Sequence, residues 1–383
     1  MASPRIYVDY NATSPVRPAA RIAALAAVDA VGNASSIHAE GRDARRRIEG
    51  ARRQVAALVG AEPGQVVFTS GGTEAAHLAL APQSRGSEPL ERLIVGATEH
   101  AAVLDGHRFQ RGQVDVVPVD PHGLVRLDRL DALLRHAAPA VVALQAANNE
   151  TGVIQDVRAV AALVHAAGGL LVCDAVQAAG RIDCTKQALG ADIVLLSAHK
   201  LGGLQGAGAV AIIGEQIDPP PAWRGGGQER GRRGGTESVP AVAAFGAAAE
   251  IATDRADVVR VREIRDLFEA EVTRLAPDVA IFGAETARLP NTSCFALAGI
   301  AAEHLVMALD LGGVAVSSGS ACSSGKVGRS HVLESMRIRA DLRQGAVRVS
   351  FGWRSSPDDV ARIIGILASS VTRVGPRTLS TAA

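Results

Sequence analysis

Cys322 is the residue whose surroundings first suggest chemistry. It lies in the segment Ser317-Ser318-Gly319-Ser320-Ala321-Cys322-Ser323-Ser324-Gly325, in which every neighbour is small. Serine and glycine give a backbone wide conformational freedom and leave a thiol unshielded, so such a loop can carry a sulfur nucleophile between two places. The alternative is a free surface cysteine on a linker, and this segment alone leaves both interpretations open.

The other three cysteines suggest neither a disulfide framework nor a structural metal site. Cys173, Cys184 and Cys294 form no C-x-x-C pair, and no histidine stands at zinc-finger spacing from them. Cys173 and Cys294 lie in apolar, strand-like runs. This predicts inert core residues, because an unpaired cysteine is among the most buried residue types. Cys184 carries no signal in either direction.

A glycine turn with a neighbouring hydroxyl follows the apolar run 66–69. The residues Ser70-Gly71-Gly72-Thr73-Glu74 lead directly into a helical stretch. Free N–H groups at a helix start, together with the Thr73 hydroxyl, can hold a phosphate. The same residues can also be a simple turn followed by a helix cap. A nucleotide P-loop is not supported, because no G-x-x-x-x-G-K-[ST] motif is present.

Two more polar clusters stand at the ends of apolar runs. The run 170–173 ends at Asp174, with Gln177 three residues later, and the next run ends in Ser197-Ala198-His199-Lys200. A lysine at the edge of a sheet is well placed to form a Schiff base, and a nearby aspartate can hold a protonated pyridine nitrogen. Taken singly, each of these residues is more often a solvated loop charge.

The elements that must position these residues form a repeating pattern, in which β-type runs alternate with helical stretches. The runs are Val66–Thr69, Leu93–Ala97, Val114–Val119, Ala140–Leu144, Leu170–Asp174, Ile193–Ser197 and Gly208–Ile213. Near-continuous apolar strands with crossover helices predict an α/β fold, with a mainly parallel mixed sheet between helices. In such folds ligands gather at the carboxyl ends of the strands, where the polar clusters stand.

A second, smaller α+β domain is predicted after the glycine- and arginine-rich stretch Gly225–Gly235. An alanine-rich helical segment leads into a long helix around Asp254–Arg274, and strands follow near Asn291–Leu297 and Arg348–Phe351. We predict a large domain over residues 14–250 and a small domain over residues 1–13 and 251–383, which carries the Cys322 loop and lets it move. No internal repeat is evident.

Charge and hydropathy favour a soluble cytoplasmic protein that acts on a small molecule. The chain has 40 lysine and arginine residues against 39 aspartate and glutamate residues, so no net field draws it to nucleic acid or to a membrane. Arg230, Arg232 and Arg233 lack interleaved aromatic residues, which favours a solvated or interface loop over a nucleic-acid patch. The N-terminus lacks a signal-peptide core, and no apolar run is long enough to span a bilayer.

Taken together, the motifs occur in the order and spacing of a fold-type I pyridoxal-phosphate enzyme. With Cys322, the chain resembles the cysteine desulfurases of the NifS/IscS type, in the class V aminotransferase family. The resemblance extends over almost the whole chain. It includes Tyr7-Val8-Asp9-Tyr10-Asn11-Ala12-Thr13, Thr98-Glu99-His100, Asn148-Asn149-Glu150-Thr151-Gly152, Gly225-Gly226-Gly227-Gln228-Glu229-Arg230 and Val347-Arg348-Val349-Ser350.

The resemblance implies pyridoxal 5′-phosphate as cofactor and assigns residues to it. Lys200 would hold the cofactor covalently and move the substrate's α-proton, and His100 would stack on the pyridine ring. Asp174 would pair with the ring nitrogen, and Gln177 would bond the phenolic oxygen. The residues implied for the phosphate are Gly72, Thr73, Ser197, His199 and Thr236, the last supplied by the neighbouring subunit of a homodimer.

The resemblance also implies the substrate and the fate of its sulfur. Arg348 would bind the carboxylate of L-cysteine as a bidentate fork, helped by Asn149, which also lines the cofactor site. Cys322 would take the sulfur as a persulfide, leaving L-alanine, and pass it to an acceptor protein. The length of the loop through Ser330 favours delivery to an iron–sulfur scaffold. No resident metal is implied, although Cys322 could transiently ligate a cluster with a partner.

Other functions stay open at this point. A selenocysteine lyase or an aminotransferase of the same family is the nearest alternative, although a transaminase needs no thiol on a mobile loop. A catalytically idle scaffold is a more distant one, disfavoured because Lys200, Asp174 and Cys322 are all present. Acceptors for tRNA or DNA thiolation also remain open. The chain departs from the family pattern at Ala75-Ala76-His77, Arg224 and Gln228. These departures affect the expected surroundings of the cofactor, not the lysine, the aspartate or the cysteine.

Overall fold

The computed structural model describes residues 5–135, 137–319 and 329–374. The chain divides into two compact units, each of which is described by itself. Unit 1 consists of Met1–Ala12, Glu150–Val153 and Asp257–Ala383, and unit 2 of Thr13–Asn149 and Ile154–Ala256. Cys322 lies outside the described residues.

Unit 2 is built on a sheet of seven strands in the order β2-β10-β9-β8-β7-β5-β6. These strands are β2 (Val66–Thr69), β10 (Gly208–Ile212), β9 (Ile193–Ser197), β8 (Leu170–Asp174), β7 (Val141–Gln145), β5 (Leu93–Gly96) and β6 (Val114–Val117). From β9 to β6 all neighbours are parallel, whereas β10 is antiparallel to both β9 and β2. The predicted mainly parallel mixed sheet is thus confirmed.

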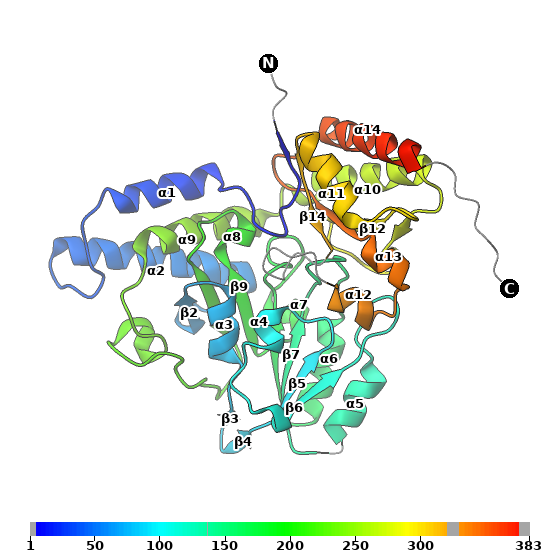
Figure 1. Cartoon of the computed structure of the whole chain (residues 1–383). Helices are drawn as coiled ribbons and strands as arrows, with labels where there is room; N and C mark the ends of the chain where they lie inside the picture. The colour runs from blue at the N-terminus through cyan, green and yellow to red at the C-terminus, as the bar shows by residue number, and fades with distance from the viewer. Residues whose placement is uncertain (1–4, 136, 320–328, 375–383) are drawn as a thin grey trace. The chain divides into compact units, whose positions relative to one another are not determined.

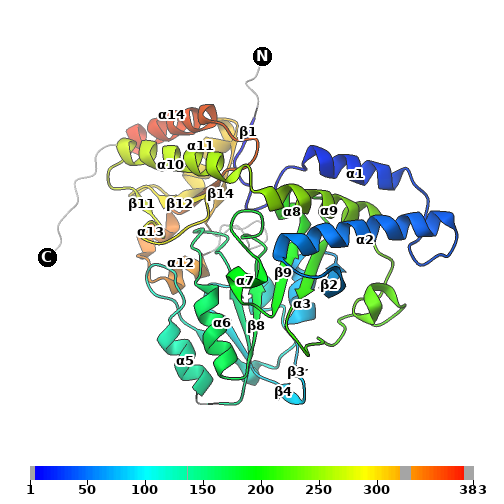
Figure 2. The ribbon, with the colours of Figure 1, turned by 180° about the vertical axis from the view of Figure 1, so that it is seen from behind.

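Helices cover both faces of this sheet. Helix α3 (Gly72–Ala79) and the short α4 (Ala101–Leu104) lie over one face (Figure 1), and α6 (Val157–Ala166) and α7 (Lys186–Leu189) lie over the other (Figure 2). The strands are buried on both faces, and apolar residues such as Val95, Val172 and Leu195 join the helices in one core. This explains why the strands read as continuous apolar runs.

A layer of three helices completes unit 2. Helix α1 (Pro18–Val28) and helix α2 (Ala39–Val59) pack against α9 (Val239–Asp254). Helix α2 begins where the His38 ring accepts a hydrogen bond from the N–H of Gly41, and ends at Gly60, whose φ of 64° is the left-handed conformation that glycine adopts readily. The remaining strands and α-helices of unit 2 are β3 (Gln83–Arg85), β4 (Glu88–Leu90), α5 (Leu127–Arg135) and α8 (Ala198–Leu201).

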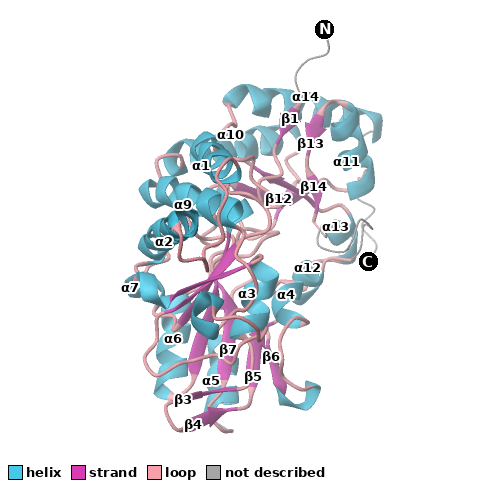
Figure 3. Cartoon of the chain, turned by 90° about the vertical axis from the view of Figure 1, so that its left-hand side faces the viewer, coloured by secondary structure: helices cyan, strands magenta, loops and turns pink. Residues whose placement is uncertain are grey.

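Unit 1 is an α+β unit with its own core. Its four-stranded sheet has the order β11-β12-β15-β14, with all neighbours antiparallel, and β1 pairs in parallel with β13. The strands are β1 (Ile6–Tyr7), β11 (Ala280–Ile281), β12 (Thr292–Ala296), β13 (Val314–Ala315), β14 (Ser317–Ser318) and β15 (Val347–Ser350). The helices are α10 (Val258–Leu275), α11 (Ala302–Leu311), α12 (His331–Ser335), α13 (Ala340–Gln344) and α14 (Pro357–Val374). Figure 3 shows the strands and helices of the chain in separate colours.

Candidate active site

The polar residues singled out in the sequence gather at one edge of the unit 2 sheet. Strands β5, β7, β8 and β9 are parallel, so their carboxyl ends meet at the same edge. Strand β2 points the same way, because β2 and β9 are both antiparallel to β10. The segments that leave this edge contain Gly72 and Thr73 after β2, His100 after β5, Asn149 after β7, Asp174 and Gln177 at and after β8, and Ser197, His199 and Lys200 at and after β9.

Asp174 is the electrostatic centre of this edge. Burial raises the pKa of its carboxyl, while the N–H of Val176, 2.9 Å from Oδ1, and the charges of His100 and Lys200 lower it. The side chains of His100, after β5, and Lys200, after β9, therefore lie within electrostatic reach of Asp174. The predicted grouping of Asp174, His100 and Lys200 is present in unit 2.

The His100 ring is held in place by the helix that follows it. His100 is the N-cap of α4, and its Nδ1 accepts a hydrogen bond from the N–H of Ala102 at 3.1 Å. An accepting Nδ1 carries no proton, so the neutral ring bears its proton on Nε2. This cap fixes the ring where the strand ends and leaves a flat aromatic surface for stacking.

A cradle for an anion is formed where the end of β2 approaches the end of β9. A Cβ added to Gly72 would lie 3.3 Å from Cγ2 of Val176 and 3.5 Å from Cβ of Ser197, so three segments converge there. Helix α3 begins at Gly72, and no side chain caps it among the described residues. Its N-terminal N–H groups and positive dipole end suit a phosphate. The Ser197 hydroxyl does not cap α8 either.

His199 is a neutral residue of this cradle. Burial, followed by the charge of Lys200, lowers the pKa of the imidazole to about 4. Its Nδ1 lies 3.2 Å from the hydroxyl of Thr13. If this hydroxyl donates to Nδ1, the proton of the ring is on Nε2, which can then donate to an anion.

Gln177 is held by Arg181. The guanidinium Nη1 of Arg181 donates to the side-chain Oε1 of Gln177 at 2.6 Å and to its backbone carbonyl at 2.7 Å. Gln177 is buried and Arg181 is half-buried. The amide of Gln177 therefore has a fixed orientation, with its oxygen toward Arg181.

Behind the strand ends, a buried amide network supports the loops. The Gln145 side chain donates to the carbonyl and the hydroxyl of Thr98, and the Asn148 side chain donates to the same carbonyl at 3.1 Å. The Glu99 carboxylate accepts the N–H of Gln145 at 2.9 Å, and burial raises its pKa well above the usual range. Asn149, which follows this network, is buried as well.

The segment that carries Thr236 is fixed by a buried ion pair that sequence reasoning missed. Glu229 accepts from Nη1 and Nη2 of Arg52 at 2.7 and 2.8 Å, and from the N–H of Phe68 at 2.8 Å. Arg52 and Glu229 are only 3% and 4% exposed, whereas Thr236 is exposed. The burial of Arg52 could have been predicted from the sequence, because Arg52 lies on the same face of the helix as the apolar residues Ile48 and Val55.

Arg348 lies in unit 1, on β15, and is also buried. Its Nη2 donates to Oδ1 of Asp9 at 2.7 Å, which places the predicted carboxylate-binding arginine beside an acidic partner. Glu150 is buried in the same unit and accepts the Ser330 hydroxyl at 2.5 Å. Burial raises the pKa of Glu150 to about 7, against the opposing effects of Ser330 and of the Arg348 charge.

The prediction that Cys173 and Cys294 are inert core residues is confirmed. Both are buried and unpaired, and burial raises the pKa of each thiol. Cys184 is buried too, and its pKa rises to about 12 for the same reason. Thiolate chemistry needs a lowered pKa and access, so none of these three is a nucleophile.

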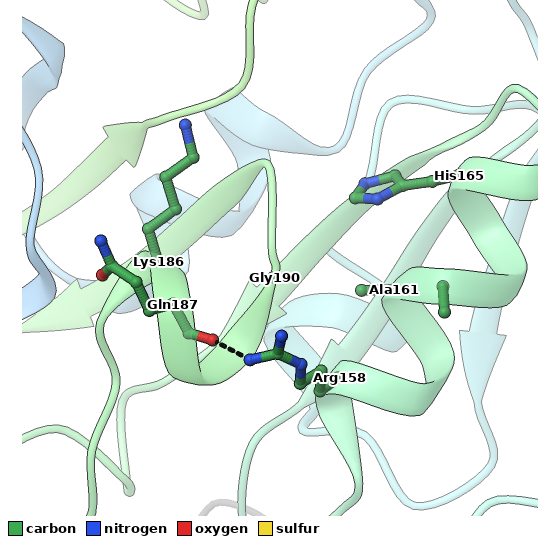
Figure 4. A pocket seen from close by; sticks show the side chains of 7 residues that line it. Arg158, Ala161, His165, Lys186, Gln187 and Gly190 are labelled. Carbon is green, nitrogen blue, oxygen red and sulfur yellow. Dashed lines mark hydrogen bonds between the residues drawn. The ribbon is translucent and has the colours of Figure 1, made fainter.

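A pocket elsewhere in unit 2 does not coincide with the predicted residues. It measures about 500 Å³ and opens between α6 and α7 (Figure 4). The pocket is lined by Arg158, Ala161, Ala162, His165, Lys186, Gln187 and Gly190. The guanidinium of Arg158 donates a hydrogen bond to the backbone carbonyl of Gln187. In the part of the chain that the structure describes, no cluster of His, Cys, Asp or Glu could hold a metal, and no helix could cross a membrane.

Comparison with known proteins decides the family. The family described as aminotransferase class-V matches residues 6–363. The chain belongs to this family. A cysteine desulfurase from Cereibacter sphaeroides is 39% identical to this class-V chain over 97% of it and 96% of the relative. An IscS-like cysteine desulfurase from Mycobacterium tuberculosis is 37% identical, with 98% of both chains covered.

Solved structures agree with this assignment. A NifS-like protein from Rickettsia africae superposes with a TM-score of 0.86 at 30% identity, covering 96% of this chain and all of the other. The predicted fold type I architecture is thereby confirmed. Class-V aminotransferases are pyridoxal 5′-phosphate proteins. The residues of unit 2 fit this cofactor, because a Cβ at Gly72 would crowd Val176 at 3.3 Å and because a carboxylate and a lysine lie at adjoining strand ends.

Proposed function

We propose that this protein is a cysteine desulfurase, which converts L-cysteine to L-alanine and takes the sulfur as a persulfide on Cys322. The observation that carries the proposal is the clustering of Asp174, His100 and Lys200 at one sheet edge, in a chain that matches cysteine desulfurases over nearly its whole length. The bound cofactor supplies an electron sink for the charge that develops at the substrate Cα.

Each residue of the unit 2 edge has a part in holding that cofactor. Lys200 would form the covalent link to the cofactor, and Asp174, which lies within electrostatic reach of Lys200, would pair with the ring nitrogen. His100 presents the flat ring that its helix cap orients. The phosphate would be bound by Gly72, Thr73, Ser197 and the neutral His199, with Thr236 of a second copy of the chain completing the site. Asn149 would line the cofactor site.

The proton and sulfur steps are carried out by side chains of this protein. Lys200 would take the proton from the substrate Cα and return a proton later. Arg348, supported by Asn149, binds the substrate carboxylate. The thiolate of Cys322 attacks the sulfur of the substrate, so that one S–S bond forms as the C–S bond breaks, and the carbon product becomes L-alanine.

The two predicted domains have separate tasks in this proposal. The large domain, residues 14–250, binds the cofactor, and the small domain, residues 1–13 and 251–383, brings Cys322 and Arg348 to the substrate. A homodimer is proposed because Thr236 is exposed at the end of a glycine-rich segment. We propose an iron–sulfur scaffold protein as acceptor, on the basis of the loop length that favours direct delivery.

The test is the formation of L-alanine from L-cysteine in the presence of a thiol reductant. We expect L-alanine and sulfide from the wild type, but not from Cys322→Ala, which keeps the yellow absorbance of the loaded protein. Cys184→Ala is the matched control, since it removes a buried thiol and should leave turnover unchanged. Normal turnover by Cys322→Ala would reject the role of that thiol, and a loaded wild type without L-alanine would indicate another substrate.

A further inference from the structure

Arg181 contacts a residue of the proposed site without being assigned any part in it. Its Nη1 donates at 2.6 Å to Oε1 of Gln177, the residue to which the family resemblance assigns a bond with the phenolic oxygen of the cofactor. Gln177 is 6% exposed, so its amide cannot turn freely into solvent. The question is which end of this amide is presented to the cofactor.

The chemistry of the guanidinium answers it. Arginine has five N–H donors and no acceptor, so the amide atom at hydrogen-bond distance from it must be the oxygen. The NH₂ group of Gln177 is on the opposite side of the same planar amide and faces away from Arg181. An amide presented this way to a phenolate oxygen is a donor, whereas the flipped amide would present an oxygen to an oxygen.

The local backbone makes this contact possible. The N–H groups of Ala178 and Ala179 both bond the carbonyl of Ala175, and the N–H of Arg181 bonds the carbonyl of Ala178, so residues 175–182 form consecutive tight turns. Gly180 between them has a φ of 75°, and a Cβ there would lie 2.8 Å from Cβ of Ala252. The turn therefore packs closely against α9. It also brings Arg181 back to Gln177, which lies four residues earlier in the chain.

A second hydrogen bond from the same nitrogen strengthens the arrangement. Nη1 of Arg181 also donates to the backbone carbonyl of Gln177 at 2.7 Å. The guanidinium thus holds both the main chain and the amide oxygen of one residue. Two hydrogen bonds from one cationic group restrict the amide more tightly than a single neutral contact does.

We infer that Arg181 is a positioning residue, which fixes the amide of Gln177 so that its NH₂ group donates to the phenolic oxygen of the bound cofactor. The inference rests on the proposed function. A hydrogen bond to that oxygen would withdraw charge from it, and so would lower the pKa that the yellow absorbance of the loaded protein reports. Loss of the donor therefore raises the pH at which the yellow absorbance of the loaded protein changes.

The experiment is a pH titration of that absorbance, which does not depend on turnover. In Arg181→Met the titration midpoint should rise by about 0.5 to 1 pH unit, the size expected for one weakened hydrogen bond to a charged group. Gln177→Ala should raise it at least as far. Arg181→Lys, which keeps a cationic donor on a slightly shorter side chain, should stay nearer to the wild-type midpoint than Arg181→Met does. It is also the variant to compare if Arg181→Met does not fold.

The double variant separates positioning from a direct charge effect. If Arg181 acts through Gln177, Arg181→Met adds no further shift in a Gln177→Ala background. An unchanged midpoint in Arg181→Met, or a full additional shift in the double variant, would overturn the inference and leave the proposed function intact. A wild type that shows no yellow absorbance with added cofactor would instead reject the proposed function, and the inference with it.

Discussion

The buried pair of Arg52 and Glu229 makes a sharp prediction about stability. The pair joins α2 to the glycine-rich segment and to β2, through two charged hydrogen bonds and one to the N–H of Phe68. Glu229→Gln removes the negative charge but keeps the shape of the side chain. The new NH₂ group then faces the donors of Arg52, and a guanidinium is left buried without its counter-ion.

The size of the effect follows from the geometry. Two unit charges about 4 Å apart attract by about 4 kcal/mol at an effective dielectric constant of about 20. Removal of one partner from a buried pair typically destabilises a protein by about 3–5 kcal/mol, because the remaining charge stays desolvated. We expect Glu229→Gln to fall in this range. Arg52→Met combined with Glu229→Gln should recover part of the loss, with a coupling of about 1–3 kcal/mol.

The loss of stability can be measured by urea unfolding, followed by the fluorescence of a tryptophan in unit 2. The chain has two tryptophans, so in a Trp353→Phe background Trp223 alone reports on unit 2, where it stacks near His77 at a ring distance of 6.2 Å. Asp128→Asn is the matched control, since it removes an exposed carboxylate paired with Arg126 in the same unit and should leave the midpoint unchanged.

Two results would refute the reasoning. A Glu229→Gln midpoint equal to that of Asp128→Asn would mean that the pair does not stabilise unit 2. Losses that simply add in the double variant would mean that the two side chains act independently, against the distances between them.

Three further predictions concern single residues. Burial raises the pKa of Glu150 to about 7, so the folded state binds more protons than the unfolded state, and stability falls as the pH rises from about 4.5 through about 7. Glu150→Gln should reduce this loss of stability, measured by thermal unfolding between pH 5 and 8. An unchanged dependence of stability on pH would contradict the prediction. Gly72→Ala places a methyl group 3.3 Å from Val176 and should weaken cofactor binding roughly tenfold, as read by equilibrium dialysis; unchanged affinity would exclude the cradle. Asp9→Asn should raise KM for L-cysteine about 10-fold or more with a smaller change in kcat, because Arg348 loses its orienting partner; an effect confined to kcat would argue against this.

The strands were predictable because their signal is local. Val66–Thr69, Leu170–Asp174 and Ile193–Ser197 begin and end where the sequence predicts, since each apolar run is closed by a polar or glycine residue. The residues Asp174 and Lys200 could be found for the same reason, as they stand immediately beyond buried strands. The reversed direction of β10 has no such signal, because a buried strand reads alike in either direction.

The contacts that hold the site in place were not predictable in the same way. The sequence around Arg348 does not show that its side chain is only 2% exposed and paired with Asp9, which lies 339 residues earlier. Glu229 pairs with Arg52 across 177 residues of sequence. A charged residue gives no sign of its partner when that partner is brought close only by tertiary folding.

The antiparallel strand β10 places Gly208 in register with both Thr69 and Ser197, the last residues of the two strands that lead into the phosphate cradle. A Cβ at Gly208 would lie 2.5 Å from the carbonyl carbon of Gly71. The spacing between the two sides of the cradle is thus set by the backbone of Gly208, the one residue of β10 without a side chain. Gly208 has no proposed part in binding the cofactor, yet any side chain there would displace the Gly71 turn, which is proposed to bind the phosphate. In a saturation screen for activity, this position should tolerate as little change as a residue that binds the cofactor directly.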